Sequence, residues 1–376
     1  HSPIFFNLWE KEKVRHPNTG EKFCIQCHNP VAFVTGVDLE SINSLVGLDS
    51  AQVPYSTKEG ISCSFCHSVT GLSSTYFAND NLTPSVAYHL YPGENIFFGS
   101  IENPEPTEFH QSVYSPIYNR SEMCLPCHDL VMRDVEAEIT FTEWNRIPGL
   151  AMSGSLPCQE CHMPVKSDGT HDHRFVGVDI DLTYPMGQNP LYEPVSNMLE
   201  NAIDLEFGVP GYNINDTIST NQTLLVPITI TSLTAHNIPS GTSFSREAWM
   251  EIIVSNASDT IFSSGFIEDP TMDLDIYDPN LLLFTSYFLD DSGDTTNSIT
   301  LTHDIINETL PALGQRYHLY EINLPNDLTG QIQISARMRF RAFKPYLLAL
   351  DHPDLLINQP IFDMGHLSYE VIINDD

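Results

Sequence analysis

The sequence contains the pentapeptide Cys-x-x-Cys-His four times, and these four copies use all eight cysteines of the 376-residue chain. Two sulfurs three positions apart can each form a thioether with one vinyl group of a single haem, and the following histidine can then bind the iron. A structural zinc site or a disulfide framework also uses paired cysteines, but neither explains a histidine after every second cysteine. We therefore predict four covalently bound haem c groups, each with its iron.

The motifs assign the attachment residues and one axial ligand of each iron. The predicted thioether positions are Cys24, Cys27, Cys63, Cys66, Cys124, Cys127, Cys158 and Cys161, and the predicted proximal ligands are His28, His67, His128 and His162. The second axial ligand matters because an iron bound by two histidines has no open position for a substrate. No Cys-x-x-Cys-Lys variant is present.

The remaining histidines outnumber the four second axial positions. His110 opens the connector that leads into the third motif, so we expect it over a haem beside that motif. His171 and His173 follow the fourth motif, and only one of them need bind an iron. His16 lies too close to Cys24 to reach easily over its own haem, so it is a candidate ligand for another haem or another subunit. His89 and His1 are substitutes.

Composition predicts the compartment and excludes some partners. The chain has 49 acidic and 16 basic side chains, a formal net charge of −33, which repels nucleic acid and anionic lipid. Covalent haem attachment predicts an extracellular or cell-surface protein, and the absence of a basic and apolar leader predicts that a secretory signal peptide has been cleaved. No apolar run approaches the roughly 18 residues of a membrane span, so we expect no membrane insertion.

Six Asn-x-Ser/Thr sequons are candidate sites for glycans and fit a cell-surface glycoprotein. They begin at Asn81, Asn119, Asn215, Asn221, Asn256 and Asn307.

The positions of the motifs predict two domains. Residues 1-185 form the tetrahaem c-type cytochrome domain, a multihaem domain with short helices and little regular structure. Ser121 to Cys124 fits a capping box at the start of a helix. Residues 205-376 form an antiparallel β-sandwich domain.

Several segments support the β-domain. Gln331 to Phe343 alternates, with Ile332, Ile334, Ala336, Met338 and Phe340 on one face, as in a strand with one face in water. Leu225 to Thr231 and Trp249 to Val254 are further predicted strands, and a helix is expected near Lys344 to Leu350.

Three stretches of the first domain and one of the second resemble a known family. They are Glu59 to Ser68, His110 to Asp129, Cys158 to Pro164 with His173-Arg174-Phe175, and Ala235-His236-Asn237-Ile238-Pro239-Ser240-Gly241. They are similar to the multihaem c-type cytochromes with a C-terminal β-domain, and within these to the tetrahaem extracellular cytochromes that polymerise into nanowires. Ala235 and Ser240 depart from the Gly-His-x-x-Pro-Thr-Gly segment of that family.

The resemblance implies that His236 is a distal haem ligand and that His16, His110, His173 and His236 complete four bis-histidine haems. It also implies a head-to-tail homopolymer in which a histidine of one subunit binds a haem iron of the next. His16 is the first candidate for that histidine, followed by His171 and His1. The expected function is electron transfer by hopping along an extracellular filament, with no substrate transformed, in contact with redox partner proteins or extracellular electron acceptors.

Two other readings stay open at this point. One is a discrete periplasmic or surface electron shuttle, which would carry the same motifs. The other is a multihaem enzyme acting on hydroxylamine, nitrite or sulfite, which would need one five-coordinate iron. The stretch Asp290 to Asp294 could also hold Ca²⁺, but it lacks the closing Glu of a calcium loop, so we expect a solvated turn.

Overall fold

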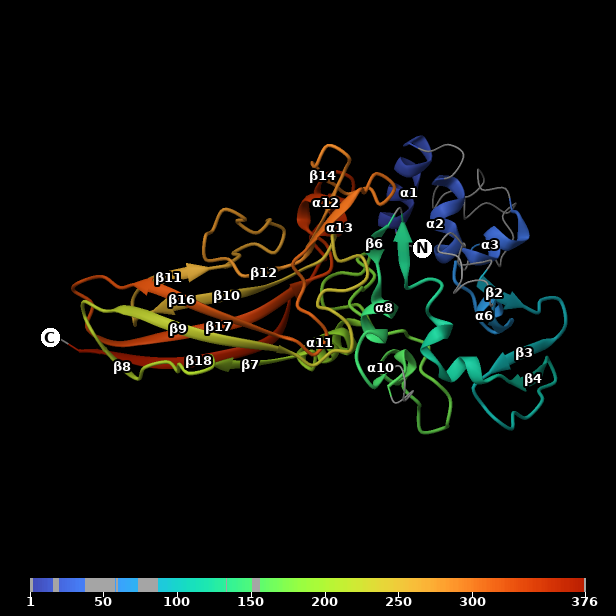
Figure 1. Cartoon of the computed structure of the whole chain (residues 1–376), viewed down its shortest axis with the longest axis horizontal. Coiled ribbons are helices and arrows are strands. Elements are labelled where there is room, and N and C mark those ends of the chain that lie inside the picture. The colour runs from blue at the N-terminus through green and yellow to red at the C-terminus, as the bar shows by residue number, and fades with distance from the viewer. Residues whose placement is uncertain are drawn as a thin grey trace. The chain divides into compact units, whose positions relative to one another are not determined.

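The chain divides into two compact units, shown with their elements in Figure 1. Unit 1 comprises His1–Phe175 and Leu289–Asp304, and unit 2 comprises Val176–Phe288 and Ile305–Asp376. The computed structural model describes residues 3–15, 20–37, 58, 60–73, 87–132, 134–150 and 156–374. The predicted domain boundaries at residues 185 and 205 stay a prediction. The predicted first domain did not include residues 289–304, which belong to unit 1.

Unit 1 consists of short helices and two-stranded sheets. Its helices are α1 (Pro3–Arg15), α2 (Gly20–His28), α3 (Pro30–Thr35), α6 (Cys63–Cys66), η3 (Pro116–Asn119), η4 (Ser121–Met123), α8 (Thr140–Asn145) and α10 (Cys158–His162). Its strands pair as β1 (Val69–Leu72) with β2 (Tyr88–Leu90), β3 (Ile96–Gly99) with β4 (Gln111–Tyr114), and β5 (Leu130–Met132) with β6 (Val135–Glu138). This agrees with the predicted short helices and scarce regular structure.

A buried carboxylate on α1 joins two distant parts of unit 1. Glu12 is 6% exposed and accepts hydrogen bonds from Ser298 Oγ at 2.7 Å, from Thr300 Oγ1, and from Arg15 Nη1 at 2.7 Å. Because these donors satisfy a carboxylate that burial would otherwise destabilise, they fix α1 against the segment 289–304. The sequence separation explains why this contact was not predicted.

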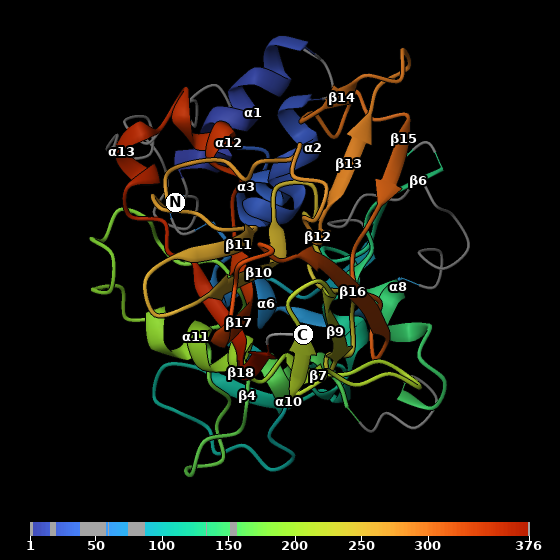
Figure 2. The ribbon, with the colours of Figure 1, turned by 90° about the vertical axis from the view of Figure 1, so that its left-hand side faces the viewer.

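Unit 2 is built from long strands, which run side by side in Figures 1 and 2. One sheet has the order β11 (Thr260–Ser264), β10 (Glu247–Ser255), β17 (Gly330–Arg341), β18 (Phe362–Asn374), β8 (Thr217–Ser219), with β12 (Leu283–Phe284) also pairing with β10. A second sheet has the order β16 (Gln315–Asn323), β9 (Thr223–Ser232), β7 (Ile203–Phe207). The helices are α11 (Tyr192–Glu200), α12 (Pro345–Ala349) and α13 (Pro353–Leu356).

A further three-stranded sheet has the order β14 (Thr295–Thr296), β13 (Ser286–Leu289), β15 (Asp304–Asn307).

Among the described residues, no helix combines the length and the apolar composition that a membrane crossing requires.

The predicted strands of unit 2 are confirmed. The five residues predicted on one face of β17 are each at most 1% exposed, and β9 and β10 contain the two other predicted strands. The predicted helix is α12. One hydrophobic core contains residues of both large sheets, such as Val226 and Ile228 of β9 and Met250 and Ile252 of β10. β8 pairs with β18 in parallel, so the sheet is not wholly antiparallel, and the sandwich arrangement stays a prediction.

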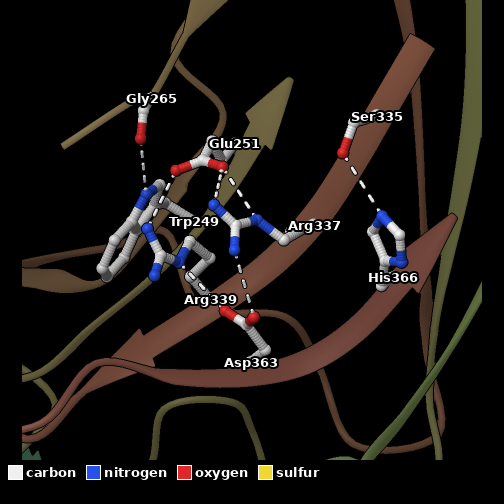
Figure 3. A network of polar contacts seen from close by, with 8 residues as sticks. All are labelled: Trp249, Glu251, Gly265, Ser335, Arg337, Arg339, Asp363 and His366. Carbon is white, nitrogen blue, oxygen red and sulfur yellow. Dashed lines mark hydrogen bonds and ion pairs between the residues drawn. The ribbon is translucent and has the colours of Figure 1, made fainter. Parts of the chain in front are cut away.

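The other face of β10 and β17 carries a network of charged side chains, drawn in Figure 3. Glu251 accepts hydrogen bonds from Nε of Arg337 at 2.8 Å and from Nη1 of Arg339 at 2.9 Å. Asp363 of β18 accepts from Arg339 Nε at 3.0 Å and Arg337 Nη1 at 3.3 Å. Trp249 lies beside them and donates from Nε1 to the carbonyl oxygen of Gly265 at 2.9 Å. The network lets the sheet bury charge on the face opposite its apolar core.

We expect the two carboxylates of this network to differ in importance. The Glu251 side chain is 1% exposed and that of Asp363 is 44% exposed, although both bind the same two arginines. Glu251→Gln should lower the free energy of unfolding by about 3 to 5 kcal/mol, because it removes the buried charge partner of both arginines and leaves them only the more exposed Asp363. Asp363→Asn, the matched control, should cost about 1 kcal/mol or less. Urea unfolding followed by circular dichroism measures both, and equal losses would contradict the expectation.

Candidate haem sites

The four motifs adopt compact local structures that bring the two cysteines of each motif to one side. The first ends α2, the second forms α6, and the fourth forms α10. The third follows η4 as a turn, in which the backbone N–H of His128 donates to the carbonyl oxygen of Cys124 at 3.1 Å. One helical turn is the spacing that two thioethers to one porphyrin require, so the backbone of each motif fits the group.

Cysteines from different motifs lie next to one another. Cys127 of the third motif lies close to Cys27 of the first, and Cys124 lies close to Cys158 of the fourth. All eight cysteines lie in the described part of the chain. The third motif is therefore near both the first and the fourth.

Ser121 joins the third and fourth motifs in a way that the sequence did not predict. The expected capping box at Ser121 is wrong, because η4 has Arg120 at its N-cap position and no side-chain cap. Ser121 Oγ instead accepts the backbone N–H of Cys158 at 3.1 Å, and Gln159 Nε2 donates to the carbonyl oxygen of Arg120 at 2.9 Å. The start of α10 is thus held directly against the segment that precedes Cys124.

The second motif shows how the fold orients a proximal histidine. His67 donates from Nδ1 to the carbonyl oxygen of Phe98 on β3 at 2.6 Å. Tyr118 stacks on the imidazole at 5.6 Å between ring centroids, and its hydroxyl donates to the carbonyl oxygen of Cys66 at 2.6 Å. A carbonyl can only accept, so the proton of a neutral imidazole is on Nδ1 and the lone pair of Nε2 is free to bind a metal.

The same orientation recurs at four candidate distal histidines. The Nδ1 atoms of His110, His171, His173 and His236 lie 3.2, 2.6, 2.9 and 3.0 Å from the carbonyl oxygens of Gln111, Met163, His171 and Asn237. Each interaction is local in sequence and leaves Nε2 as the metal-binding atom. His366 differs, because its Nε2 is itself 3.3 Å from Ser335 Oγ (Figure 3). The donor set thus fits imidazole ligation at the predicted positions.

His173 lies near the proximal histidine of the second motif. The ring centroids of His67 and His173 are 6.0 Å apart, with 34° between the ring planes. Two imidazoles that bind one metal through bonds of about 2 Å have ring centres roughly 6 Å apart. The structure therefore brings these two histidines to the separation of an axial pair.

His110 also lies near the second motif. Its ring contacts Phe97 edge to face at 4.9 Å, and Phe97 contacts His67 at 6.3 Å. His171 pairs with Val165 in a β-bridge after the fourth motif, and His89 is exposed on β2. His1 and His16 lie outside the described residues, so their proposed ligand roles stay predictions.

His236 sits in a well-ordered loop of unit 2. The loop is fixed by the bridge between Ile238 and Leu310 and by Asn237, whose Oδ1 accepts the backbone N–H of Ala312 at 3.1 Å. A loop supported in this way can present an imidazole in a defined direction. The ligand role of His236 stays a prediction.

The proximal histidines differ in electrostatic surroundings. Desolvation by the surrounding protein, with a smaller effect of nearby His128, lowers the pKa of His28 to about 4, and the ring of Phe5 stacks on this exposed histidine at 4.2 Å between centroids. Contact with Glu138, whose Oε1 lies 3.4 Å from Nδ1, raises the pKa of His128 to about 9. Burial raises the pKa of Cys24 to about 12 and that of Cys66 to about 11.

The remaining sequence candidates have ordinary surroundings. Asp290 forms a turn in which its Oδ1 accepts the backbone N–H groups of Ser292 at 2.9 Å and Asp294 at 3.1 Å. Within the described ranges, no three His, Cys, Asp or Glu side chains gather to hold a bare metal ion. His303 is exposed, and burial lowers the pKa of His318.

Comparison with solved structures identifies the fold. No family model matches the chain, and no curated protein matches it. The penta-heme cytochrome c552 from Thermochromatium tepidum matches with a TM-score of 0.65 and 20% sequence identity, over 95% of this chain and 86% of that one. A β-glucosidase from Listeria innocua matches 57% of this chain and 21% of that one, with 10% identity and a TM-score of 0.19, too low to carry an argument. The chain has the fold of a multihaem cytochrome c.

Sequence reasoning found the motif residues but missed the side chains that orient them. Tyr118, Glu138 and Phe5 each contact a proximal histidine, and none stands at a fixed spacing from its motif. The only signal was indirect: Tyr118 lies in the connector that begins at His110, one of the stretches that carried the resemblance.

We expect His173→Ala to open one iron without detaching its haem. The thioethers of Cys63 and Cys66 do not depend on the distal ligand, so haem content should be unchanged. The reduced variant should bind carbon monoxide at one haem more than the parent protein, and the ferric spectrum should gain a high-spin fraction. His303→Ala, an exposed histidine of the same unit, is the matched control. A His173→Ala protein with only low-spin haems would contradict the assignment.

Proposed function

We propose that this protein is an electron-transfer tetrahaem cytochrome c. The observation that carries the proposal is the shared orientation of four candidate ligands: His67, His110, His171 and His173 each bond a carbonyl through Nδ1, which leaves Nε2 as the metal-binding nitrogen. The four Cys-x-x-Cys-His motifs supply the attachment chemistry, and the fold is that of a multihaem cytochrome. When bound, haem iron supplies one-electron oxidation and reduction.

The chain's own residues hold the groups close together and fix their ligands. Cys127 lies close to Cys27 and Cys124 lies close to Cys158, which keeps neighbouring attachment sites near one another, and the carbonyl of Phe98 and the ring of Tyr118 keep the His67 imidazole from rotating. Small reorganisation of the ligands favours electron transfer over substrate binding. We therefore propose a carrier and not an enzyme.

Location and assembly form the finer part of the proposal. We propose an extracellular or cell-surface protein, secreted through a cleaved signal peptide, that polymerises head to tail into a filament. Most of the arginines of the described chain already pair with carboxylates of the same chain, as Arg15, Arg120, Arg146, Arg174, Arg246, Arg337, Arg339 and Arg341 do. These arginines are therefore already engaged within the subunit, and the net charge of −33 makes subunits repel one another, which favours a coordination bond from a neighbour's histidine.

A discrete surface or periplasmic shuttle is the alternative, and redox partner proteins or extracellular acceptors would serve either form. In both cases four haems are expected, a number that equals the motif count of the chain and differs from the five of the solved cytochrome.

Haem content tests the core of the proposal. The purified protein should carry four haems that resist acid-acetone extraction, because thioethers are covalent, and its ferric spectrum should be entirely low-spin. Intact-mass measurement combined with the pyridine haemochrome assay gives the number. Replacing both cysteines of one motif, for example Cys63 and Cys66 by Ala, should remove a single haem. A chain that binds zinc or forms disulfides in place of haem would contradict the proposal.

Electron microscopy of the native, unboiled protein tests assembly. Filaments with one subunit per repeat are expected, and uniform single particles would favour the shuttle. His16→Ala should leave all four haems attached but give short polymers or none, with His171→Ala and His1→Ala examined in the same way and His303→Ala as the control. Unchanged filaments for every candidate would contradict ligation between subunits.

A further inference from the structure

A short hairpin returns a carboxylate to the proximal histidine of the third motif. β5 begins just after His128, and β6 runs back antiparallel to it, so that Glu138 is paired with Leu130. The turn between them contains Asp134, whose φ of 65° is in the left-handed region. The backbone N–H of Phe141 then donates to the carbonyl oxygen of His128 at 3.0 Å. Glu138 Oε1 thereby lies 3.4 Å from His128 Nδ1.

This carboxylate is held in place and shielded from water. The Glu138 side chain is 12% exposed, and its Oε1 also accepts a hydrogen bond from Thr140 Oγ1 at 3.1 Å. Its neighbour Glu136 is 43% exposed and pairs with Arg146. The two glutamates thus have different partners, and only Glu138 faces a candidate iron ligand.

The surroundings of His128 contrast with those of His67. His67 Nδ1 faces a neutral carbonyl oxygen at 2.6 Å, whereas His128 Nδ1 faces an anion. A carboxylate partner draws the Nδ1 proton toward itself and makes the imidazole a stronger electron donor through Nε2. A stronger donor, and a negative charge nearby, favour the oxidised state of a bound iron.

The third motif is also the junction of the four. Cys127 contacts Cys27 of the first motif, and Cys124 contacts Cys158 of the fourth. Tyr88, packed against Phe65 of the second motif, donates from its hydroxyl to the carbonyl oxygen of Met123 at 2.8 Å. An electron that crosses unit 1 by short steps therefore passes the third site.

We propose that Glu138 is a positioning residue that lowers the reduction potential of the haem of the third motif. This proposal rests on the proposed haem attachment. A lower potential raises the free energy of an electron at this site, so Glu138 sets the height of one step in the electron path. Each transfer between neighbouring sites oxidises one site and reduces the next, so the step balances within the protein.

The test compares single-charge variants of the complete haem-loaded protein by spectroelectrochemical titration. In Glu138→Gln one of the four one-electron steps should move to higher potential by more than any of the other three. Glu136→Gln, on the same strand and with the same change in charge, should leave all four steps unshifted. Glu138→Asp keeps the negative charge but moves the carboxylate away from His128, so the reduction potential should rise by less than in Glu138→Gln. If the Gln variant loses haem, the Asp variant provides the test.

The possible outcomes distinguish a failure of this inference from a failure of the proposed electron-transfer function. A parent protein without four haems would contradict the proposed function. Four haems with no shifted step in both Glu138 variants would overturn the role of Glu138 and leave electron transfer standing. An equal shift of several steps, or the same shift in Glu136→Gln, would also overturn it, because it would show a diffuse effect of charge and not a contact with one ligand.

Discussion

The orientation of imidazoles by backbone carbonyls is the constraint on which unit 1 depends. Unit 1 has only small apolar clusters in its described part, such as Phe6, Trp9, Ile25 and Ala32 around α1 and α2. Its short strands do not form a large sheet, but they bring acceptors to histidines, as β3 brings the Phe98 carbonyl to His67. We infer that porphyrin surface supplies the missing apolar core, and that the polypeptide fixes the orientation of the histidine ligands.

Unit 2 is stabilised in a different way from unit 1, because its strands bury one large apolar core on one face and charged side chains on the opposite face. Glu251 and Arg339 are satisfied there by each other and by Asp363. A rigid, well-packed unit can hold a loop such as that of His236 in one conformation. Rigidity is useful to an electron carrier because it keeps the geometry of a ligand unchanged between oxidation states.

Features that depend on residues close together in the sequence could be predicted, and contacts between residues far apart in the sequence could not. Periodicity within one segment predicted the buried face of β17, because alternation is a local property. The motifs predicted attachment for the same reason. The contacts of Glu12 with Ser298 and of His67 with Phe98 join positions far apart in the chain, and no spacing rule reports them. Ser121 misled because a capping residue and a cross-motif acceptor have the same local sequence.

Charge links the local chemistry to assembly. Acidic groups near a bound iron favour its oxidised state, and the same surplus of acid makes subunits repel one another over the roughly 8 Å that physiological salt allows. Pairing of arginines within the chain leaves that repulsion largely uncancelled. In the proposed filament, a subunit contact made by a metal–ligand bond would depend little on surface charge. A coordination bond between subunits is therefore compatible with the acidity that lowers the potential of a bound iron.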